Sequence, residues 1–323
     1  MDATFQLLYR SVQQHNGARR EGVAFDGKDT NALARSELEH CQRAGIRVIG
    51  PGDAEWPEAL DRLSAPPICL YALGQELRSG VRTLGVVGTR SPTPYGLECC
   101  GRLVRPLARR DVEIWSGMAR GIDQAAHVSA LEAGGITRAV LGAGLLRPYP
   151  SGSEGLMRRI AERGTVLSEY PPTASARRHY FPRRNALLAA IAADVLVVQA
   201  AERSGSLLTA WMALDLGGTV LAVPDRIDEP LSRGGLALLR EGAVPVGSAA
   251  DLVESLGWEL APEEAASAED PLLRLLGEGA LGLEELALRL GQPLGRALAL
   301  IARREASGEL RRTEDGRYVR TAR

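Results

Sequence analysis

Residues 84 to 256 alternate short apolar runs with amphipathic stretches, and this alternation constrains the fold more than any other feature of the sequence. The strand-like runs are 84–88, 112–117, 137–144, 165–170, 194–201, 219–224 and 243–248. Uninterrupted apolar runs such as VLVVQA indicate strands that are covered on both faces, as the strands of a parallel sheet are. The pattern therefore predicts an α/β fold, a doubly wound, mostly parallel sheet with helices on both faces.

Smaller segments flank this region. Residues 1–79 begin with helix-like sequence and continue into a proline-marked stretch, which favours a small helical amino-terminal domain. Residues 259–270 are acidic and alanine-rich without apolar periodicity, as expected of a linker. Residues 271–323 read as three short helices and a hairpin, the pattern of a winged helix. We therefore expect three domains, over 1–79, 80–258 and 271–323.

Composition excludes several classes of protein. Hydrophobic residues make up 45% and charged residues 24% of the 323 residues, which is typical of a globular chain rather than a disordered one. No apolar run approaches about 18 residues, and the amino terminus lacks a basic region followed by an apolar run, so we expect a cytoplasmic protein with no membrane partner. The four cysteines lack CxxC spacing and the four histidines lack HExxH spacing, so we expect no disulfide scaffold, no metal and no cofactor.

The kind of cation is more informative than the net charge of −1. Lys28 is the only lysine, so nearly every cation is an arginine. Guanidinium groups form bidentate contacts with phosphates and stack on planar rings. Only Lys28 could serve as a Walker A lysine or form a Schiff base. Mechanisms of these two kinds are therefore nearly excluded.

Loops at the carboxyl ends of the predicted strands carry polar, glycine-containing sequence. Ligands of doubly wound sheets bind at this edge, and the amides of a helix start together with Arg90 suit an anion. The alternative is a set of capped helix starts, with Ser206 as one cap and Arg90 as a surface cation. The candidate residues in these loops are Gly88, Thr89, Arg90, Ser91, Gly117, Arg120, Gly121, Ser204, Gly205, Ser206 and Thr209.

The segment SARRHYFPRRN, residues 175–185, gives the strongest functional signal. Its candidate residues are Arg177, Arg178, Tyr180, Phe181, Arg183, Arg184 and Asn185. Arginines hold phosphates while rings stack on exposed bases, so this mixture predicts a site for single-stranded nucleic acid. The alternative is a helix cap whose Phe181 belongs to the core. The segment contains no acid, and four arginines without a counter-charge would repel one another unless an anion binds.

Two other functions remain open from the residues. No GxSxG motif is present, and no spacing suggests a serine, histidine and carboxylate triad. Glu169 and Glu202 end predicted strands and would serve as acid or base in a nucleotide-cleaving enzyme of the phosphoribohydrolase type. A regulator that binds DNA through the carboxyl-terminal winged helix is the third possibility. His127 lies within a predicted helix, where we expect it to hydrogen-bond locally.

Eight segments, in order, closely resemble the DNA processing protein A family (DprA, also called Smf). They are VVGTRSPTPYG, WSGMARGIDQAAH, AVLGAG, LSEYPP, FPRRN, VVQAAERSGSLLTA, LAVPDRIDEPLSRGG and LLREGA. The resemblance runs from about Gly45 to Leu256 and resumes in the carboxyl-terminal module. It implies a Rossmann-like core, preceded by a small helical domain, in a cytoplasmic homodimer. It also implies a protein that binds and protects single-stranded DNA during natural transformation and helps to load the RecA recombinase, and not a hydrolase.

The resemblance also carries over individual residues. By position, the family's GSR-type loop falls on Gly88, Thr89 and Arg90, and its basic and aromatic DNA pocket falls on Arg178 and Phe181. Ala186 replaces the last arginine of the family's FPxRNR segment, and Leu236 replaces the asparagine of its SxGxN segment. One phosphate contact is therefore lost or supplied elsewhere.

We therefore predict a non-catalytic site for single-stranded DNA. Phosphates are expected at Arg90, Arg120, Arg178 and Arg184, and the amides of Gly205 and Ser206 are expected to complete the wall. Phe181 or Tyr180 is expected to stack on a base. Four phosphate contacts predict that log affinity falls with log salt concentration with a slope of about −3.

Overall fold

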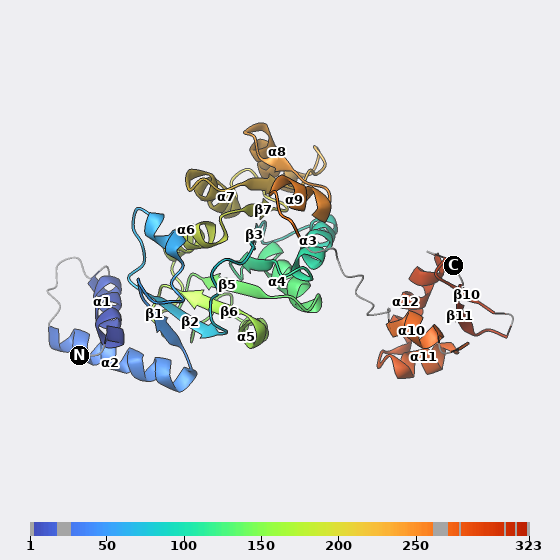
Figure 1. Ribbon diagram of the computed structural model, residues 1–323, viewed down its shortest axis with the longest axis horizontal. Coiled ribbons are helices and arrows are strands. Elements are labelled where there is room, and N and C mark those ends of the chain that lie inside the picture. Colours follow the sequence, from blue (N-terminus) through green and yellow to red (C-terminus); the bar gives the residue numbers. More distant parts are fainter. Residues whose placement is uncertain are drawn as a thin grey trace. The chain divides into compact units, whose positions relative to one another are not determined.

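The computed structural model describes residues 3–17, 27–260, 271–277, 279–306, 308–313 and 315–321. The chain forms two compact units, Met1–Leu260 and Ala261–Arg323 (Figure 1), each of which is described by itself. Of the linker expected over 259–270, residues 261–270 lie outside the described residues. None of the helices in these ranges combines the length and the apolar character needed to cross a lipid bilayer.

A nine-stranded sheet forms the centre of the first unit. Its parallel strands, in spatial order, are β6 (Thr165–Ser168), β5 (Thr137–Leu141), β4 (Glu113–Ser116), β3 (Thr83–Val87), β7 (Val195–Val197), β8 (Val220–Ala222) and β9 (Val244–Pro245). The chain runs outward from β3 to β6, then returns to the other side of β3 and continues outward from β7 to β9. The prediction of a doubly wound, mostly parallel α/β sheet is confirmed. The gap between the loops that follow β3 and β7 is its topological switch point.

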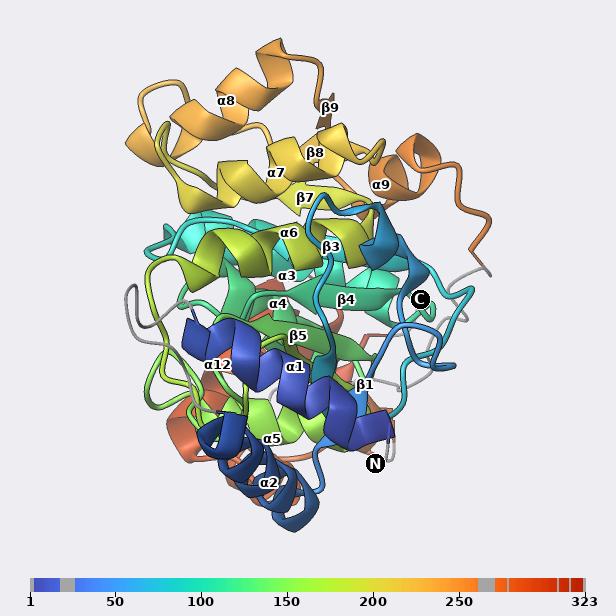
Figure 2. The same ribbon diagram turned by 90° about the vertical axis from the view of Figure 1, so that its left-hand side faces the viewer.

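Helices cover both faces of this sheet, as Figure 2 shows. One face carries α6 (Tyr180–Ala192), α7 (Gly205–Asp215) and α8 (Arg233–Arg240), and the other carries α3 (Pro94–Ala108), α4 (Ile122–Glu132) and α9 (Ala249–Ser255). In β7, Val195 and Val197 pack in the first core, whereas Leu196 packs in the second. Because alternate side chains enter two different cores, the strand has no polar position.

The amino-terminal segment differs from the separate helical domain that the sequence predicts. Its elements are α1 (Ala3–Gly17), α2 (Gly27–Ala44), β1 (Arg47–Ile49), the 3₁₀ helix η1 (Glu58–Arg62) and β2 (Leu70–Gly74). β2 pairs antiparallel with β6, where Tyr71 lies opposite Ser168, and the buried Tyr71 hydroxyl donates to Ser11 Oγ in α1 at 3.0 Å. The segment therefore covers the edge of β6 and shares a core with it, because an uncovered edge would expose unpaired backbone groups.

The second unit contains the three helices and the hairpin that the sequence predicts. They are α10 (Pro271–Gly277), α11 (Leu283–Arg289), α12 (Leu294–Ala306), β10 (Leu310–Arg312) and β11 (Tyr318–Arg320). The two strands pair antiparallel, with Leu310 opposite Arg320. Leu276, Leu286 and Ile301 pack in one small core with Leu310. The assignment of this unit as a winged helix stays a prediction.

His127 makes the stability of the first unit depend on pH. It is fully buried in α4, and its Nδ1 donates to Thr137 Oγ1 at 2.7 Å, while that hydroxyl donates to the carbonyl of Ile114. The local hydrogen bond expected for His127 is confirmed. Burial, assisted by the Arg184 charge, lowers the pKa of His127 to about 3. An unfolded histidine has a pKa near 6.5, so below that pH the unfolded chain alone takes up the proton.

We therefore expect the free energy of unfolding to fall by about 2 kcal/mol between pH 7 and pH 5 through His127 alone. The loss should begin as the pH drops below 6.5 and continue towards pH 3. His127→Asn keeps a donor near the position of Nδ1 but does not titrate, so its unfolding free energy should depend less on pH. Urea unfolding of both proteins at the two pH values measures the difference. An equal pH dependence would show that another group is responsible.

Candidate nucleic-acid interface

Two adjoining pockets lie at the carboxyl edge of the parallel strands. Their volumes are about 260 Å³ and about 420 Å³, and both are lined by Arg90, Ala119, Phe181 and Arg184. We call the two together the trough. The predicted site residues that line it are Gly88, Arg90, Ser91, Gly117, Arg120, Phe181, Arg184, Asn185, Ser204, Gly205, Ser206 and Thr209. The trough lies at the switch point because the loops after β3 and β7 both contribute to it.

Arg90 and Phe181 form the part of the trough that combines charge with a ring. Arg90 is exposed, and its guanidinium carbon lies 5.7 Å from the centroid of the Phe181 ring. Phe181 is half-buried at the start of α6, and the Tyr149 ring meets it edge-on with centroids 5.5 Å apart. A cation and a ring at this separation are suited to hold a phosphate and the base next to it.

Arg184 forms the floor of both pockets and is only 5% exposed. Its Nη1 donates to the Val140 carbonyl at 3.3 Å and lies 3.8 Å from Asp123 Oδ2. Burial, the largest cause, lowers the pKa of Arg184 and raises that of Asp123, whereas the attraction between the two charges opposes both shifts. The pair therefore places a poorly solvated guanidinium, compensated by the Asp123 carboxylate, at the floor of the trough.

The expectation that the arginines of 175–185 lack counter-charges is wrong for two of them. Arg184 faces Asp123, and Arg183 donates from Nε to Glu169 Oε2 at 2.7 Å. Both carboxylates come from outside the segment, so its local composition gives no sign of them. Burial raises the pKa of Glu169, and the contact with Arg183 counteracts that rise.

Thr89 and Gly121 join two of the loops and do not line the trough. Gly121 precedes α4 with φ +84°, and a Cβ atom there would overlap the Thr89 carbonyl oxygen. That oxygen accepts the Ile122 N–H at 3.2 Å. Glycine is therefore required both for its backbone conformation and for the close approach of the loop after β3.

The start of α7 forms another wall of the pocket that Arg90 lines. Ser204, and not Ser206, is the N-cap: its Oγ accepts the Ser206 N–H at 3.3 Å and lies 2.6 Å from Ser206 Oγ. The Asn185 side chain donates to the Gly205 carbonyl at 3.1 Å and so ties α6 to this wall. The resulting wall presents hydroxyls and the amino end of a helix, both of which favour an anion.

The remaining predicted residues lie outside the trough. Tyr180 is 5% exposed and stacks on Tyr170 with centroids 3.6 Å apart, so of the two expected rings only Phe181 is available. Arg177 lies 5.9 Å from the Tyr180 ring. Arg178 is exposed, but neither pocket includes it, nor does either include Arg183.

Tyr149 is a member of the trough that the sequence interpretation does not single out. It is exposed in the loop that follows β5, and it lines the larger pocket next to Phe181. Its position in a loop after a predicted parallel strand could have identified Tyr149 as a candidate from the sequence. In the part of the chain that the structure describes, no group of three or more His, Cys, Asp or Glu side chains is placed to hold a metal ion.

Gly117 gives room to Arg184. A Cβ atom at position 117 would overlap Arg184 Nη1. We therefore expect Gly117→Ala to displace the guanidinium, to lower the free energy of unfolding by about 1–3 kcal/mol and to weaken DNA binding. Gly155→Ala is the control, because nothing lies within 4 Å of the added methyl group there. Thermal unfolding and oligonucleotide binding measure the two effects, and equal behaviour of the two variants would contradict the assigned packing.

Comparison with known proteins decides the family. Residues 47–257 match the family model described as DNA recombination-mediator protein A. The chain belongs to the DNA processing protein A family. A DNA processing protein DprA of Mycobacterium tuberculosis is 40% identical over 332 residues, which cover 95% of this chain and 83% of the relative. DprA of Bacillus subtilis is 37% identical over 213 residues, covering 66% and 72% of the two chains.

Solved structures of the family have the same fold. DprA of Streptococcus pneumoniae matches with a TM-score of 0.64 and 29% identity, covering 80% of this chain and 94% of that one. DprA of Helicobacter pylori matches with a TM-score of 0.58 and 29% identity, covering 65% and 95%. The latter structure concerns the single-stranded DNA binding mode of the Helicobacter protein. Membership of a family of recombination mediators agrees with the resemblance drawn from the motifs.

Proposed function

We propose that this protein binds single-stranded DNA in the trough, protects it and passes it to a RecA-type recombinase. The observation that carries the proposal is the position of Arg90 beside the Phe181 ring, at the point where the two pockets meet. The ring stacks on a base, and base faces are accessible only in an unpaired strand. The proposed selectivity for single strands follows from this requirement.

Phosphates are held by charge and by backbone groups. Arg90 and Arg120 are exposed at the rim, Arg184 lies at the floor, and α7 directs its amino end at the same space. Guanidinium groups and helix amides contact phosphate oxygens irrespective of sequence. The proposed binding is therefore independent of base sequence, as protection of any incoming strand requires.

The proposal includes a homodimer that acts in the cytoplasm without catalysis. Two troughs on one strand would bind by avidity, which raises affinity without any new contact. Neither Glu169 nor Glu202 lines the trough, and Glu169 pairs with Arg183, so no carboxylate proposed for cleavage faces the bound strand.

Salt dependence tests the number of phosphate contacts. The three arginines that line the trough predict a slope of log affinity against log salt concentration of about −2, and a further contact by Arg178 would bring it to about −3. Electrophoretic shifts of single- and double-stranded oligonucleotides at several salt concentrations measure the slope and the selectivity. A flat salt response, or equal affinity for duplex, would refute the proposed mode of binding.

A further inference from the structure

A pocket of about 350 Å³ adjoins the trough along α6, and we call it the side pocket. Pro182, in the first turn of α6, lines both the side pocket and the smaller pocket of the trough. The side pocket is otherwise built from α6 and its N-cap His179, from Met212 of α7 and from residues 63–65, which follow η1. None of these other residues lines the trough, so the side pocket is a separate space that begins at Pro182.

Two consecutive turns of α7 lead from the trough to the side pocket. Leu208 lines the trough, and Met212, four residues later in the same helix, lines the side pocket. Leu208 is 45% exposed, and Pro182 is exposed as well. One turn of an α-helix rises about 5.4 Å, so a strand that leaves the trough over these two side chains reaches the side pocket after a short step.

The interior of the side pocket is apolar and open to a ligand. All of its apolar lining residues except Leu187 are at least partly exposed. Apolar side chains and a thioether sulfur pack favourably against an aromatic ring. The interior therefore suits a flat aromatic group. The apolar lining residues are Leu63, Ala65, Pro182, Ala186, Leu187 and Met212.

The polar residues around this interior favour an anion. They are Ser64, His179 and Arg183, and no acid among the described residues lines the side pocket. Glu169 holds Arg183 through the 2.7 Å contact, but its side chain is 2% exposed, whereas that of Arg183 is 33% exposed. The guanidinium is therefore the part of this pair that a ligand meets. An apolar interior beside a cation fits a nucleotide, whose base enters the pocket while its phosphate stays outside.

Ala186 keeps the side pocket open. It is half-buried in α6, it lines the pocket, and it stands where the family's FPxRNR segment has its last arginine. A long side chain at this position would enter the same space. The alanine therefore removes one cation from the segment and leaves room for a base beside Arg183.

We propose that the side pocket binds a base of the same DNA strand that occupies the trough. The strand leaves the trough over Pro182, the base packs against Ala186 and Met212, and its phosphate lies beside Arg183. This inference rests on the proposed function and adds a further base-binding position to it. It also makes residues 63–65 of the amino-terminal segment a part of the DNA interface.

Photocrosslinking of the full chain to a long oligothymidylate that carries iododeoxyuridine throughout locates the bound bases. Mass spectrometry of the peptides should find crosslinks in two places, at Tyr149 or Phe181 in the trough and at His179 or Met212 in the side pocket. Crosslinks confined to the trough would overturn the side pocket and leave the proposed function standing. Crosslinks to the side pocket without any in the trough would overturn both.

Ala186→Leu fills the side pocket with an apolar side chain and removes no charge. Its affinity for the long oligothymidylate should fall about tenfold, because one base loses its contacts. A thymidine trinucleotide, which occupies the trough alone, should bind as it does to the parental protein. Ala250→Leu is the matched control, because it adds the same side chain at an exposed position of α9 on the other face of the sheet.

Thermal unfolding shows that the Ala186 variant is folded. Parental affinity for the long strand in this folded variant, beside weakened binding by the Arg90 and Phe181 double alanine variant, would overturn the side pocket and leave the trough in place. An equal loss of affinity for the trinucleotide would also overturn it, because the substitution would then act on the trough itself.

Discussion

Replacing Arg90 and Phe181 together by alanine is expected to weaken binding of single-stranded oligonucleotides about a hundredfold. Stacking on one aromatic side chain contributes about 1–3 kcal/mol per base, and loss of a phosphate contact adds to it. Arg90 is exposed and Phe181 is only half-buried, so the folded state should lose little stability. Fluorescence anisotropy with a labelled oligonucleotide gives the affinity, and thermal unfolding shows that the variant is folded.

Arg102→Ala is the control for this double variant. Arg102 lies on the exposed side of α3, where it pairs with Glu98 at 3.0 Å, outside both pockets of the trough. Arg102→Ala removes the same positive charge as Arg90→Ala. It should change the affinity for the oligonucleotide by less than about threefold. A folded double variant with parental affinity would exclude the trough as the DNA site.

Arg178→Ala separates the family resemblance from the geometry. The resemblance places a DNA contact at Arg178, whereas neither pocket of the trough includes this exposed side chain. Measured in the same assay, an effect comparable to that of Arg90→Ala would extend the bound strand beyond the two pockets towards the segment before α6.

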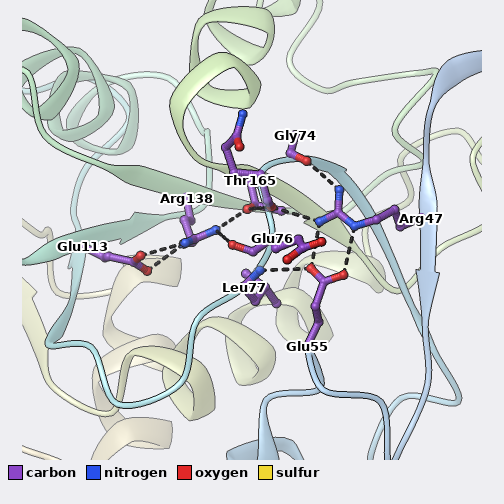
Figure 3. A network of polar contacts seen from close by, with 9 residues as sticks. Arg47, Glu55, Gly74, Glu76, Leu77, Glu113, Arg138 and Thr165 are labelled. Carbon is purple, nitrogen blue, oxygen red and sulfur yellow. Dashed lines mark hydrogen bonds and ion pairs between the residues drawn. The ribbon is translucent and has the colours of Figure 1, made fainter.

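Glu113→Ala is expected to lower the free energy of unfolding by about 3–5 kcal/mol. Glu113 and Arg138 face each other across β4 and β5 with side chains 4% and 2% exposed. Arg138 also donates to the Glu76 carbonyl at 3.1 Å and to Thr165 Oγ1 (Figure 3). Removing the carboxylate leaves a buried guanidinium whose charge is uncompensated, and these neutral acceptors cannot replace it.

An exposed ion pair provides the comparison. Glu132 lies 3.2 Å from Arg105, and the side chains are 52% and 45% exposed. Glu132→Ala should cost less than about 1 kcal/mol, because water and salt already screen this pair. Denaturant unfolding of the two variants measures both losses. Similar losses would mean that water compensates the Arg138 charge in the Glu113 variant.

Much of the core fold is determined locally and is therefore accessible from sequence. Each parallel strand, such as β7, is a run of apolar residues because both of its faces are covered, and each loop after a strand must contain residues that can turn and cap. The doubly wound rule then places these loops at one edge without any knowledge of contacts. For this reason the predicted residues of the loops after β3 and β7, except Thr89, meet in the trough.

What depends on partners distant in the sequence was decided by the tertiary structure alone. Asp123 and Glu169 compensate Arg184 and Arg183 from other elements, and Tyr180 turns into the core because Tyr170 offers it a stacking surface. In the same way, β2 joined the sheet between β1 and β6 because β6 had an edge to cover. The sequence by itself determined which residues could bind DNA, through their chemistry and their place after buried strands. Only the tertiary structure decided which of them face the same space, because burial and charge compensation depend on neighbours that no local pattern specifies.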